Sequence, residues 1–238
     1  MRFINERNRE PRELSEYRDT TPDATYDDLR CKEQIRQSLV NEQGYICAYC
    51  MGKIDVNDST IEHYISQKRH QDSPYSEAEH KKQSLLYSNM YGVCINNAKH
   101  CDKKRGNIPI NILDPHHDSC EELITYNLDG EIIPAGRDKE KVQTDIDLLG
   151  LNCKRLKDGR VAAKDEVWDR FQVDYNKETW TKKLFMEKAE YYRNKQRRRG
   201  GKYKFHAYCN FIAWYFSYYA DNYKSIIYSQ PGCHDFVF

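Results

Sequence analysis

The chain has no long hydrophobic run, because its apolar stretches end after a few residues. A helix that crosses a bilayer needs about 20 predominantly apolar residues in succession, so the sequence excludes a transmembrane segment. The first seven residues include three charged side chains and offer no apolar signal core. We therefore expect a soluble, cytoplasmic protein.

Net charge is also almost absent. The 38 Lys and Arg residues stand against 37 Asp and Glu residues, for a formal net charge of +1. Bulk charge therefore identifies no partner, and a nucleic-acid surface would have to be a local patch. The chain is polar, yet 13% of its 238 residues are aromatic, and these bulky side chains can build a core. We expect one domain, or a core domain with one satellite.

Cysteine, by contrast, is present in an informative number. The count of nine is odd, and without an export signal a disulfide framework is not expected. Cys47 and Cys50 form a CxxC pair, and six residues separate Cys94 from Cys101. Two short-range thiolate pairs around a longer loop are typical of tetrahedral zinc, and four protein ligands leave no open position for substrate. We predict a structural Zn²⁺ on these four cysteines, with His100 able to replace one thiolate.

Two other interpretations of the CxxC pair stay open, a redox pair and ordinary buried thiols. The remaining cysteines have no partner at metal-binding spacing and are expected to be small buried residues; they are Cys31, Cys120, Cys153, Cys209 and Cys233.

The segment between the two cysteine pairs carries the residues on which a family resemblance depends. It contains Thr-Ile-Glu-His-Tyr-Ile at 60–65 and Ser-Asn-Met-Tyr at 88–91, and Asp102 follows the last cysteine directly. In this order the sequence resembles the HNH endonuclease family of the zinc-stapled ββα-metal type. The stretches 42–50 and 61–64 are similar to the PtuB-like subfamily, and the resemblance extends over residues 25 to 160.

The resemblance implies a role for each motif residue. His63 would be the general base that activates water, and Glu62 and Asp102 would ligate a catalytic divalent ion. Two carboxylates with retained waters suit Mg²⁺ or Mn²⁺. Asn89 would hold the loop between the strands and so aim His63 at the phosphate.

The sequence departs from the family pattern at two places. Ser66 and Gln67 follow where the family often has proline, and the second cysteine pair is wider than the usual CxxC. The wider spacer makes the alignment of Asp102 less direct, but the site keeps its two carboxylates. Each motif residue also has a simpler interpretation: Glu62 and His63 as surface polarity, Asn89 as a turn residue, Asp102 as a helix cap.

Two basic segments are candidate nucleic-acid contacts. The first, beside the proposed site, comprises Lys103, Lys104 and Arg105. The second is the run 193–204, which has seven basic residues and no acidic one and includes Arg197, Arg198 and Arg199. Such contacts would give salt-dependent affinity with little base specificity. The alternative is a solvated helix end and linker.

PtuB-like proteins are the nuclease partners of an ATPase in Septu anti-phage defence, and some are encoded with retrons. The resemblance therefore implies a PtuA-like ATPase partner, a nucleic-acid substrate, and a link to a retron reverse transcriptase and its msDNA. DNA is the first interpretation of the substrate and structured RNA the alternative, because the metal and base mechanism needs no 2′-hydroxyl. The alternative hypothesis is a non-catalytic, zinc-stabilised module that binds nucleic acid or protein.

The predicted fold class is α+β, in four parts. These are a polar, extended N-terminal arm (1–24), the zinc-stapled ββα-metal nuclease module (25–115), a hairpin and helix extension (116–160), and a helical C-terminal region (161–238). We expect a helix after residues 20–23 that ends near Gly44, a hairpin over 122–133, and a helix closed by Gly150. Trp180, Leu184 and Tyr191 fit a further helix. The aromatic helix from Tyr208 to Tyr219 is either core or a docking face.

Overall fold

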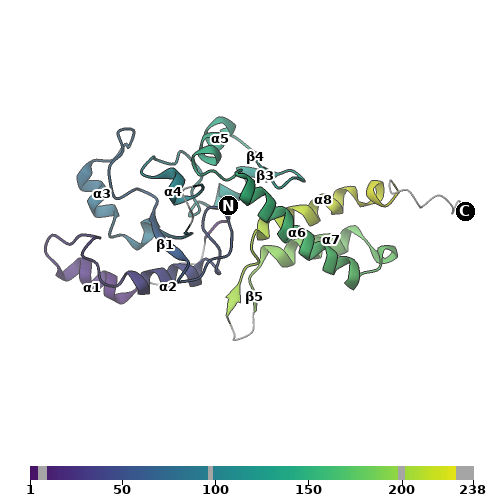
Figure 1. Ribbon diagram of the computed structural model, residues 1–238, viewed down its shortest axis with the longest axis horizontal. Helices are drawn as coiled ribbons and strands as arrows, with labels where there is room; N and C mark the ends of the chain where they lie inside the picture. Colours follow the sequence, from purple (N-terminus) through teal and green to yellow (C-terminus); the bar gives the residue numbers. More distant parts are fainter. Residues whose placement is uncertain (5–9, 96–98, 198–201, 229–238) are drawn as a thin grey trace, which may run out of the picture.

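The computed structural model describes residues 1–4, 10–95, 99–197 and 202–228, with side chains up to residue 223. The molecule is elongated, with the N-terminal elements at one end and a group of long helices at the other (Figure 1). Small antiparallel sheets and separate helices make this a mixed architecture, compatible with the expected α+β class.

Three two-stranded sheets are present within the described ranges: β1 (Ser59–His63) with β2 (Met90–Cys94), β3 (Ile124–Tyr126) with β4 (Ile132–Pro134), and β5 (Gln196–Arg197) with β6 (Tyr203–Lys204). The α-helices are α1 (Arg12–Thr20), α2 (Lys32–Glu42), α3 (Glu77–Gln83), α4 (Asp102–Arg105), α5 (Lys139–Leu148), α6 (Lys154–Asp174), α7 (Lys182–Arg193) and α8 (Cys209–Tyr228). Short 3₁₀ turns lie at Tyr87–Asn89, Asp118–Glu121 and Lys177–Thr179.

The expectation of an extended N-terminal arm is wrong for residues 12–20, which form α1. The segment is polar, but Leu14 is fully buried against Ile35 and Leu39 of α2. Arg18 also forms a 2.7 Å ion pair with Glu10. The burial of Leu14 and the ion pair of Arg18 therefore stabilise a helix in a segment whose polar composition did not predict one.

The predicted helix after residue 23 begins later than expected, at Lys32. Leu29 lies in the turn before α2, yet it joins the same apolar cluster as Ile35 and Leu39. The predicted end is confirmed, because α2 stops at Glu42 and Gly44 has a φ of +60°. Only glycine adopts that conformation without strain.

The strands β1 and β2 form an antiparallel pair that packs on α2. In their register Glu62 faces Tyr91 and His63 faces Met90. The central core joins residues 45–54 of the cysteine segment to Leu113, Ile146 and Phe211 from later parts of the chain. The cysteine segment therefore does not depend on a metal alone, since much of its core comes from elsewhere.

The predicted hairpin and the helix that follows it are confirmed as β3, β4 and α5. The carboxylate of Asp145 on α5 is fully buried and accepts hydrogen bonds from the backbone of Asn111, Ile112 and Leu113. Gly150 ends this unit with a φ of +61°, and a Cβ there would lie 2.8 Å from the carbonyl oxygen of Lys99. This extension thus braces the chain on both sides of Cys101.

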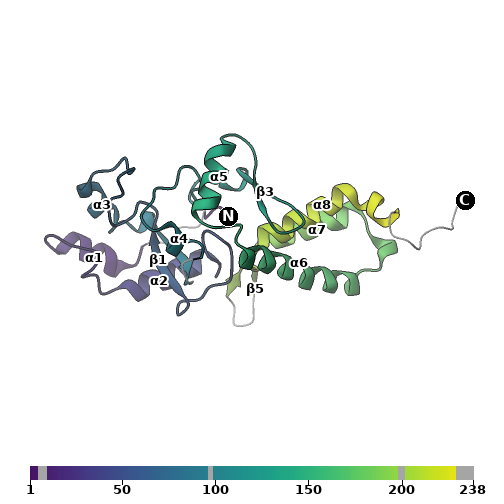
Figure 2. The same cartoon turned by 45° about the horizontal axis from the view of Figure 1, so that its top comes forward.

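The C-terminal region is helical, as predicted, and α6, α7 and α8 have a core of their own (Figure 2). Ile212, Phe216 and Ala220 of α8 are buried in it, so that face of the aromatic helix is core. Trp168 of α6 stacks on Phe171 with ring centroids 5.3 Å apart. Trp180, expected inside a helix, precedes α7 but packs against the same cluster.

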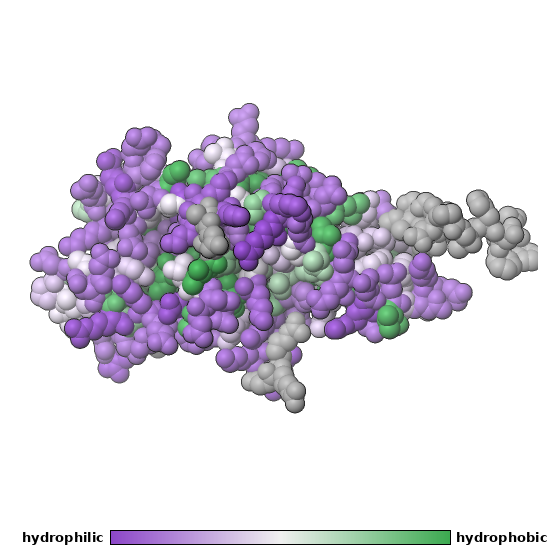
Figure 3. Space-filling view, viewed as in Figure 1, coloured by the Kyte–Doolittle hydropathy of each residue, from purple (hydrophilic) through white to green (hydrophobic). Residues whose placement is uncertain are grey.

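The face seen in Figure 3 is mostly hydrophilic, with small, scattered apolar areas. Among the helices described, none combines the length and the apolar character that crossing a membrane requires.

Candidate metal centre and active site

The first cysteine pair lies on a tight turn that follows α2. The Gly52 backbone N–H points at Cys50 Sγ at 3.4 Å, and Cys47 N donates to the Gly52 carbonyl at 2.8 Å. Met51 occupies the left-handed region with a φ of +59°. An N–H directed at a sulfur atom stabilises the thiolate form, which is the metal-binding form. The turn therefore presents two sulfur atoms in one direction.

The second pair comes from the other end of the motif. Cys94 closes β2, and Cys101 directly precedes α4 with its N–H bonded to the Leu149 carbonyl at 2.7 Å. All four sulfur atoms lie within 4.8 Å of one another. The separations Cys47–Cys101 and Cys50–Cys94 are 3.9 and 3.8 Å. A tetrahedron with Zn–S distances of about 2.3 Å has S···S edges of about 3.8 Å, so the four cysteines fit one zinc ion.

The fit extends to the electrostatics of the cluster. Burial raises the pKa of Cys101, whereas hydrogen bonds from Cys101, Cys47 and Cys50 lower the pKa of Cys94. Thiolates packed this closely repel one another, so the four thiols resist ionising together. A bound dication would offset that repulsion and favour the deprotonated forms. His100 lies beside the cluster, with Nδ1 3.3 Å from Cys101 Sγ.

The cysteines expected to lie outside the metal cluster do so wherever the structure describes them. Cys31, Cys120 and Cys209 are buried, whereas Cys153 is half-buried. Cys233 lies outside the described residues.

Next to the cysteine cluster, three of the predicted site residues line one cavity of ≈ 340 Å³. Glu62 and His63 enter it from the end of β1, and Asp102 from the first turn of α4. The other polar residues that line it are Ser66, Gln67, Lys68 and Asn107. The fold therefore brings together two carboxylates and one imidazole that are separated by up to 40 positions in the chain.

Asp102 affects the charge of Glu62. Glu62 has a pKa raised to about 8, first because it is buried and further because the charge of Asp102 and a hydrogen bond with it oppose ionisation. The Arg105 guanidinium acts in the other direction by pairing with Glu62. Two carboxylates that share a hydrogen bond in a small polar cavity are a donor set suited to a hard divalent cation such as Mg²⁺ or Mn²⁺. These residues could therefore hold the catalytic ion.

His63 is held by hydrogen bonds at both ring nitrogens. Nε2 lies 3.0 Å from the Ser84 carbonyl, which can only accept, so this nitrogen carries the proton. Nδ1 then accepts from the Gln67 side-chain amide at 3.0 Å. Burial lowers the pKa of His63 to about 4, and Tyr26 contacts the ring edge-on with centroids 4.5 Å apart. The imidazole is thus neutral at pH 7, with its lone pair on Nδ1.

Asn89 lies behind this site and holds the loop after β1. Its Oδ1 accepts from Ile65 N at 2.7 Å, and its Nδ2 donates to the carbonyls of Ile65 at 2.9 Å and Gln83 at 3.1 Å. The side chain is 4% exposed. It therefore ties the end of β1 to the end of α3, the two segments that hold His63.

Arg105 lies somewhere other than the sequence predicted. We expected it on the surface as a phosphate contact, but it is 2% exposed and forms an ion pair with Glu62. Its guanidinium also donates to the carbonyls of His63, Tyr64 and Ile108. Since the charge is enclosed and fully engaged, this structure does not present Arg105 to a phosphate.

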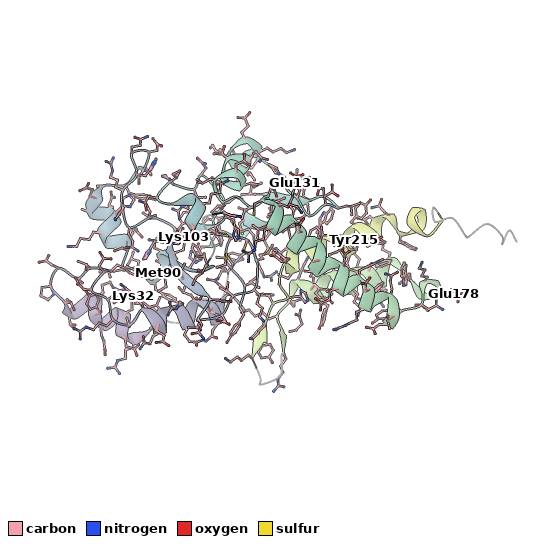
Figure 4. All side chains as sticks on the ribbon, in the orientation of Figure 1. Lys32, Met90, Lys103, Glu131, Glu178 and Tyr215 are labelled. Atoms are coloured by element: carbon pink, nitrogen blue, oxygen red, sulfur yellow. The ribbon has the colours of Figure 1, made fainter. Side chains whose placement is uncertain are left out.

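The other predicted basic contacts are distributed differently. Lys103 is exposed on α4, where Figure 4 labels it. Lys104 is also exposed, and its ammonium donates to the Asp147 carbonyl. Arg197 is exposed on β5. Arg198 and Arg199 lie outside the described residues.

Sequence reasoning missed the residues that support the site. Gln67 and Ser84 bind the His63 ring, and Tyr49 donates to Glu62 Oε1 at 3.2 Å. Gln67 had been noted only as a departure from the family pattern. The position of Tyr49 between Cys47 and Cys50 could have indicated that it lies near the site, because the CxxC turn packs in one cluster with β2.

Comparison with known proteins gives two relatives. "Retron Vc95 putative HNH endonuclease" of Vibrio cholerae serotype O1 biovar El Tor is 30% identical over 133 residues, covering 52% of this chain and 60% of that protein. "Retron Ec83 putative HNH endonuclease" of Escherichia coli is 25% identical over 193 residues, covering 62% of this chain and 73% of that protein. The chain thus spans less than two thirds of the length of the first relative. No family model matches the chain.

Both relatives carry the same family in their names. At low identity, these two relatives support an HNH nuclease family for this chain.

Proposed function

We propose that the chain is a metal-dependent HNH endonuclease that hydrolyses phosphodiester bonds of nucleic acid, with DNA preferred over RNA. The observation that carries the proposal is the single cavity lined by Glu62, His63 and Asp102 beside a tetrahedral cysteine cluster. The chain order β1, β2, α4 around it is that of a ββα-metal module, in which Zn²⁺ would be structural.

In this mechanism Glu62 and Asp102 would hold a divalent ion, which when bound would supply positive charge for the phosphorane and for the departing 3′ oxygen. His63 takes the proton from the attacking water at Nδ1. The Ser84 carbonyl fixes the tautomer that leaves Nδ1 free of a proton. The Gln67 side-chain amide donates to Nδ1 in this structure, so it has to move before water can bind at Nδ1. Asn89 keeps the loop, and so the imidazole, in position.

The phosphates on either side of the scissile bond would lie against Lys103 and Lys104, which flank the cavity on the exposed face of α4. Arg105 takes no part in that contact, because its guanidinium is buried and pairs with Glu62. We assign it a positioning role: it holds the Glu62 carboxylate at the end of β1.

The names of both relatives contain the word retron. We propose on that basis that this chain is the effector of a Septu- or retron-type anti-phage defence system. A PtuA-like ATPase would control it, and a retron reverse transcriptase with its msDNA would be further partners.

One observation favours a second candidate, a non-catalytic zinc module that binds nucleic acid or protein. Glu62 is engaged by Arg105, and both nitrogens of His63 have partners. Such contacts also suit residues that only stabilise a fold.

The test is incubation of the purified zinc-loaded protein, alone and with the product of its neighbouring gene, with plasmid DNA and with total RNA. The proposal expects cleavage that requires added Mg²⁺ or Mn²⁺ and is lost in Asp102→Asn. Binding without cleavage of either nucleic acid, under both conditions and with both ions, would favour the non-catalytic module.

A further inference from the structure

A second, larger cavity of ≈ 700 Å³ lies away from the proposed catalytic residues. Three segments enclose it: the N-terminal residues 2–4, the end of α2 with the turn that follows it (41–48), and the base of the β5–β6 hairpin. In Figure 1 this hairpin projects from the helical half beside the end of α2. The cavity shares no lining residue with the one around His63.

The joint between hairpin and turn is built into the fold. Phe205 N donates to the Gly44 carbonyl at 2.9 Å, and Lys195 Nζ donates to the Glu42 carbonyl at 3.0 Å. A Cβ at Gly44 would lie 2.6 Å from the Phe205 ring, so glycine is what allows the ring to pack there. These contacts hold the base of the hairpin against the turn after α2, so two walls of the cavity are joined.

The lining is basic. Arg2, Lys195 and Lys202 line it against one carboxylate, that of Glu42, which is 5% exposed. Lys204 adds a fourth cation next to the lining residue Tyr45. A cavity with this balance attracts an anion.

The cations lie over aromatic faces. The Arg2 guanidinium is 4.1 Å from the ring centroid of Phe205, and the Lys204 ammonium is 3.8 Å from that of Tyr45. At the rim, the Tyr203 ring is 58% exposed. Flat rings interleaved with cations are what single-stranded nucleic acid requires, because its bases stack on aromatic or guanidinium planes while its phosphates meet lysines.

We propose that this cavity binds a short stretch of single-stranded nucleic acid, with a base stacked on Tyr203 and phosphates held by Lys195 and Lys202. A duplex keeps its bases stacked on one another and has none to place on Tyr203. An acidic peptide has the charge but no ring that the exposed aromatic face would recognise. The site does not depend on the chain being a nuclease, since none of its residues belongs to the catalytic cavity.

The test is fluorescence anisotropy of the full chain with a labelled mixed-sequence single strand and with the same sequence as a duplex, without added divalent ion. The site predicts tighter binding of the single strand. Tyr203→Ala should weaken it about fivefold or more, the loss expected for one stacked base. Lys195→Gln with Lys202→Gln should lower the slope of log K against log salt by about 1.4, or 0.7 for each phosphate contact.

The matched control is Tyr191→Ala, which removes an aromatic ring that is 52% exposed on α7 and outside the cavity. Equal affinities of the Tyr203→Ala and Tyr191→Ala variants, or full displacement of the strand by an oligoglutamate peptide of equal charge, would overturn the proposal. Photocrosslinking of a thio-substituted strand to the wild-type chain gives a test that needs no variant. Crosslinks within 41–48 or 202–205 support the site, and crosslinks confined to 61–107 contradict it.

Discussion

The His63 imidazole donates from Nε2 to the Ser84 backbone carbonyl across 3.0 Å. Since the carbonyl cannot donate, this contact alone decides that Nδ1 carries the lone pair. Burial further favours the neutral ring, so His63 has the protonation state and the tautomer that a base needs at neutral pH.

The buried imidazole predicts a specific dependence of stability on pH. The pKa of His63 is lowered to about 4 in the folded chain, against about 6.5 when unfolded. The unfolded state therefore binds more protons between these values, and stability due to His63 is lost as pH falls from 6.5 to 4. Measured by urea unfolding, wild type should lose about 3 kcal/mol relative to His63→Gln over that range. A difference between the two proteins that is independent of pH would contradict the burial argument.

Removal of Arg105 should destabilise the chain strongly. Arg105→Ala breaks the buried pair with Glu62 and removes the donor to the carbonyls of His63, Tyr64 and Ile108, and breaking a buried pair costs about 3–5 kcal/mol. Lys103→Ala is the matched control on the same helix, because Lys103 is exposed and its loss should change stability by no more than about 0.5 kcal/mol. The comparison is made by chemical denaturation. Similar midpoints for both variants would mean that the ion pair contributes little.

Asn89→Ala should loosen the loop that holds His63. The substitution removes three hydrogen bonds to Ile65 and Gln83 and leaves backbone groups unsatisfied, at a cost of about 1–3 kcal/mol. Under the proposed mechanism, cleavage should fall further than the loss of folded protein explains. The exposed neighbour Ser88 offers a control as Ser88→Ala. Unchanged cleavage per folded molecule in Asn89→Ala would remove Asn89 from the mechanism.

Zinc should be lost together with the cysteine cluster. Cys47→Ser is expected to abolish stoichiometric zinc and to lower the melting temperature, since the binding free energy of a structural metal contributes to folding. Cys153→Ser changes a half-buried cysteine outside the cluster and should retain one zinc per chain. Elemental analysis of both purified variants measures the zinc content per chain. Full zinc in Cys47→Ser would show that the four sulfurs are not the ligand set.

The sequence indicated the site more completely than its surroundings. The spacing of the four cysteines predicted one metal cluster, and the resemblance to the HNH family on Glu62, His63 and Asp102 predicted that these three residues lie near it. The roles of Ser84 and Arg105 depend on tertiary packing, because their partners His63 and Glu62 lie 21 and 43 positions away in the chain. No local pattern encodes such packing.

The sequence also predicted some elements of the fold and missed others. Periodicity predicted the hairpin and the helices α5, α7 and α8, whose apolar positions repeat within each element. It missed α1, because that helix is fixed by Leu14 packing against α2, and the packing depends on residues more than 20 positions away. The face of α8 that is buried could be assigned only when α6 and α7 were seen to cover it.

Cleavage by wild type and by His63→Ala, with zinc content measured on the same samples, tests the account most directly. The zinc cluster contains no atom of His63, so both proteins should hold one zinc ion per chain. Only the wild type should cleave nucleic acid when Mg²⁺ or Mn²⁺ is added. Equal cleavage by the two proteins, with zinc retained in both, would contradict the assignment of His63 as the base.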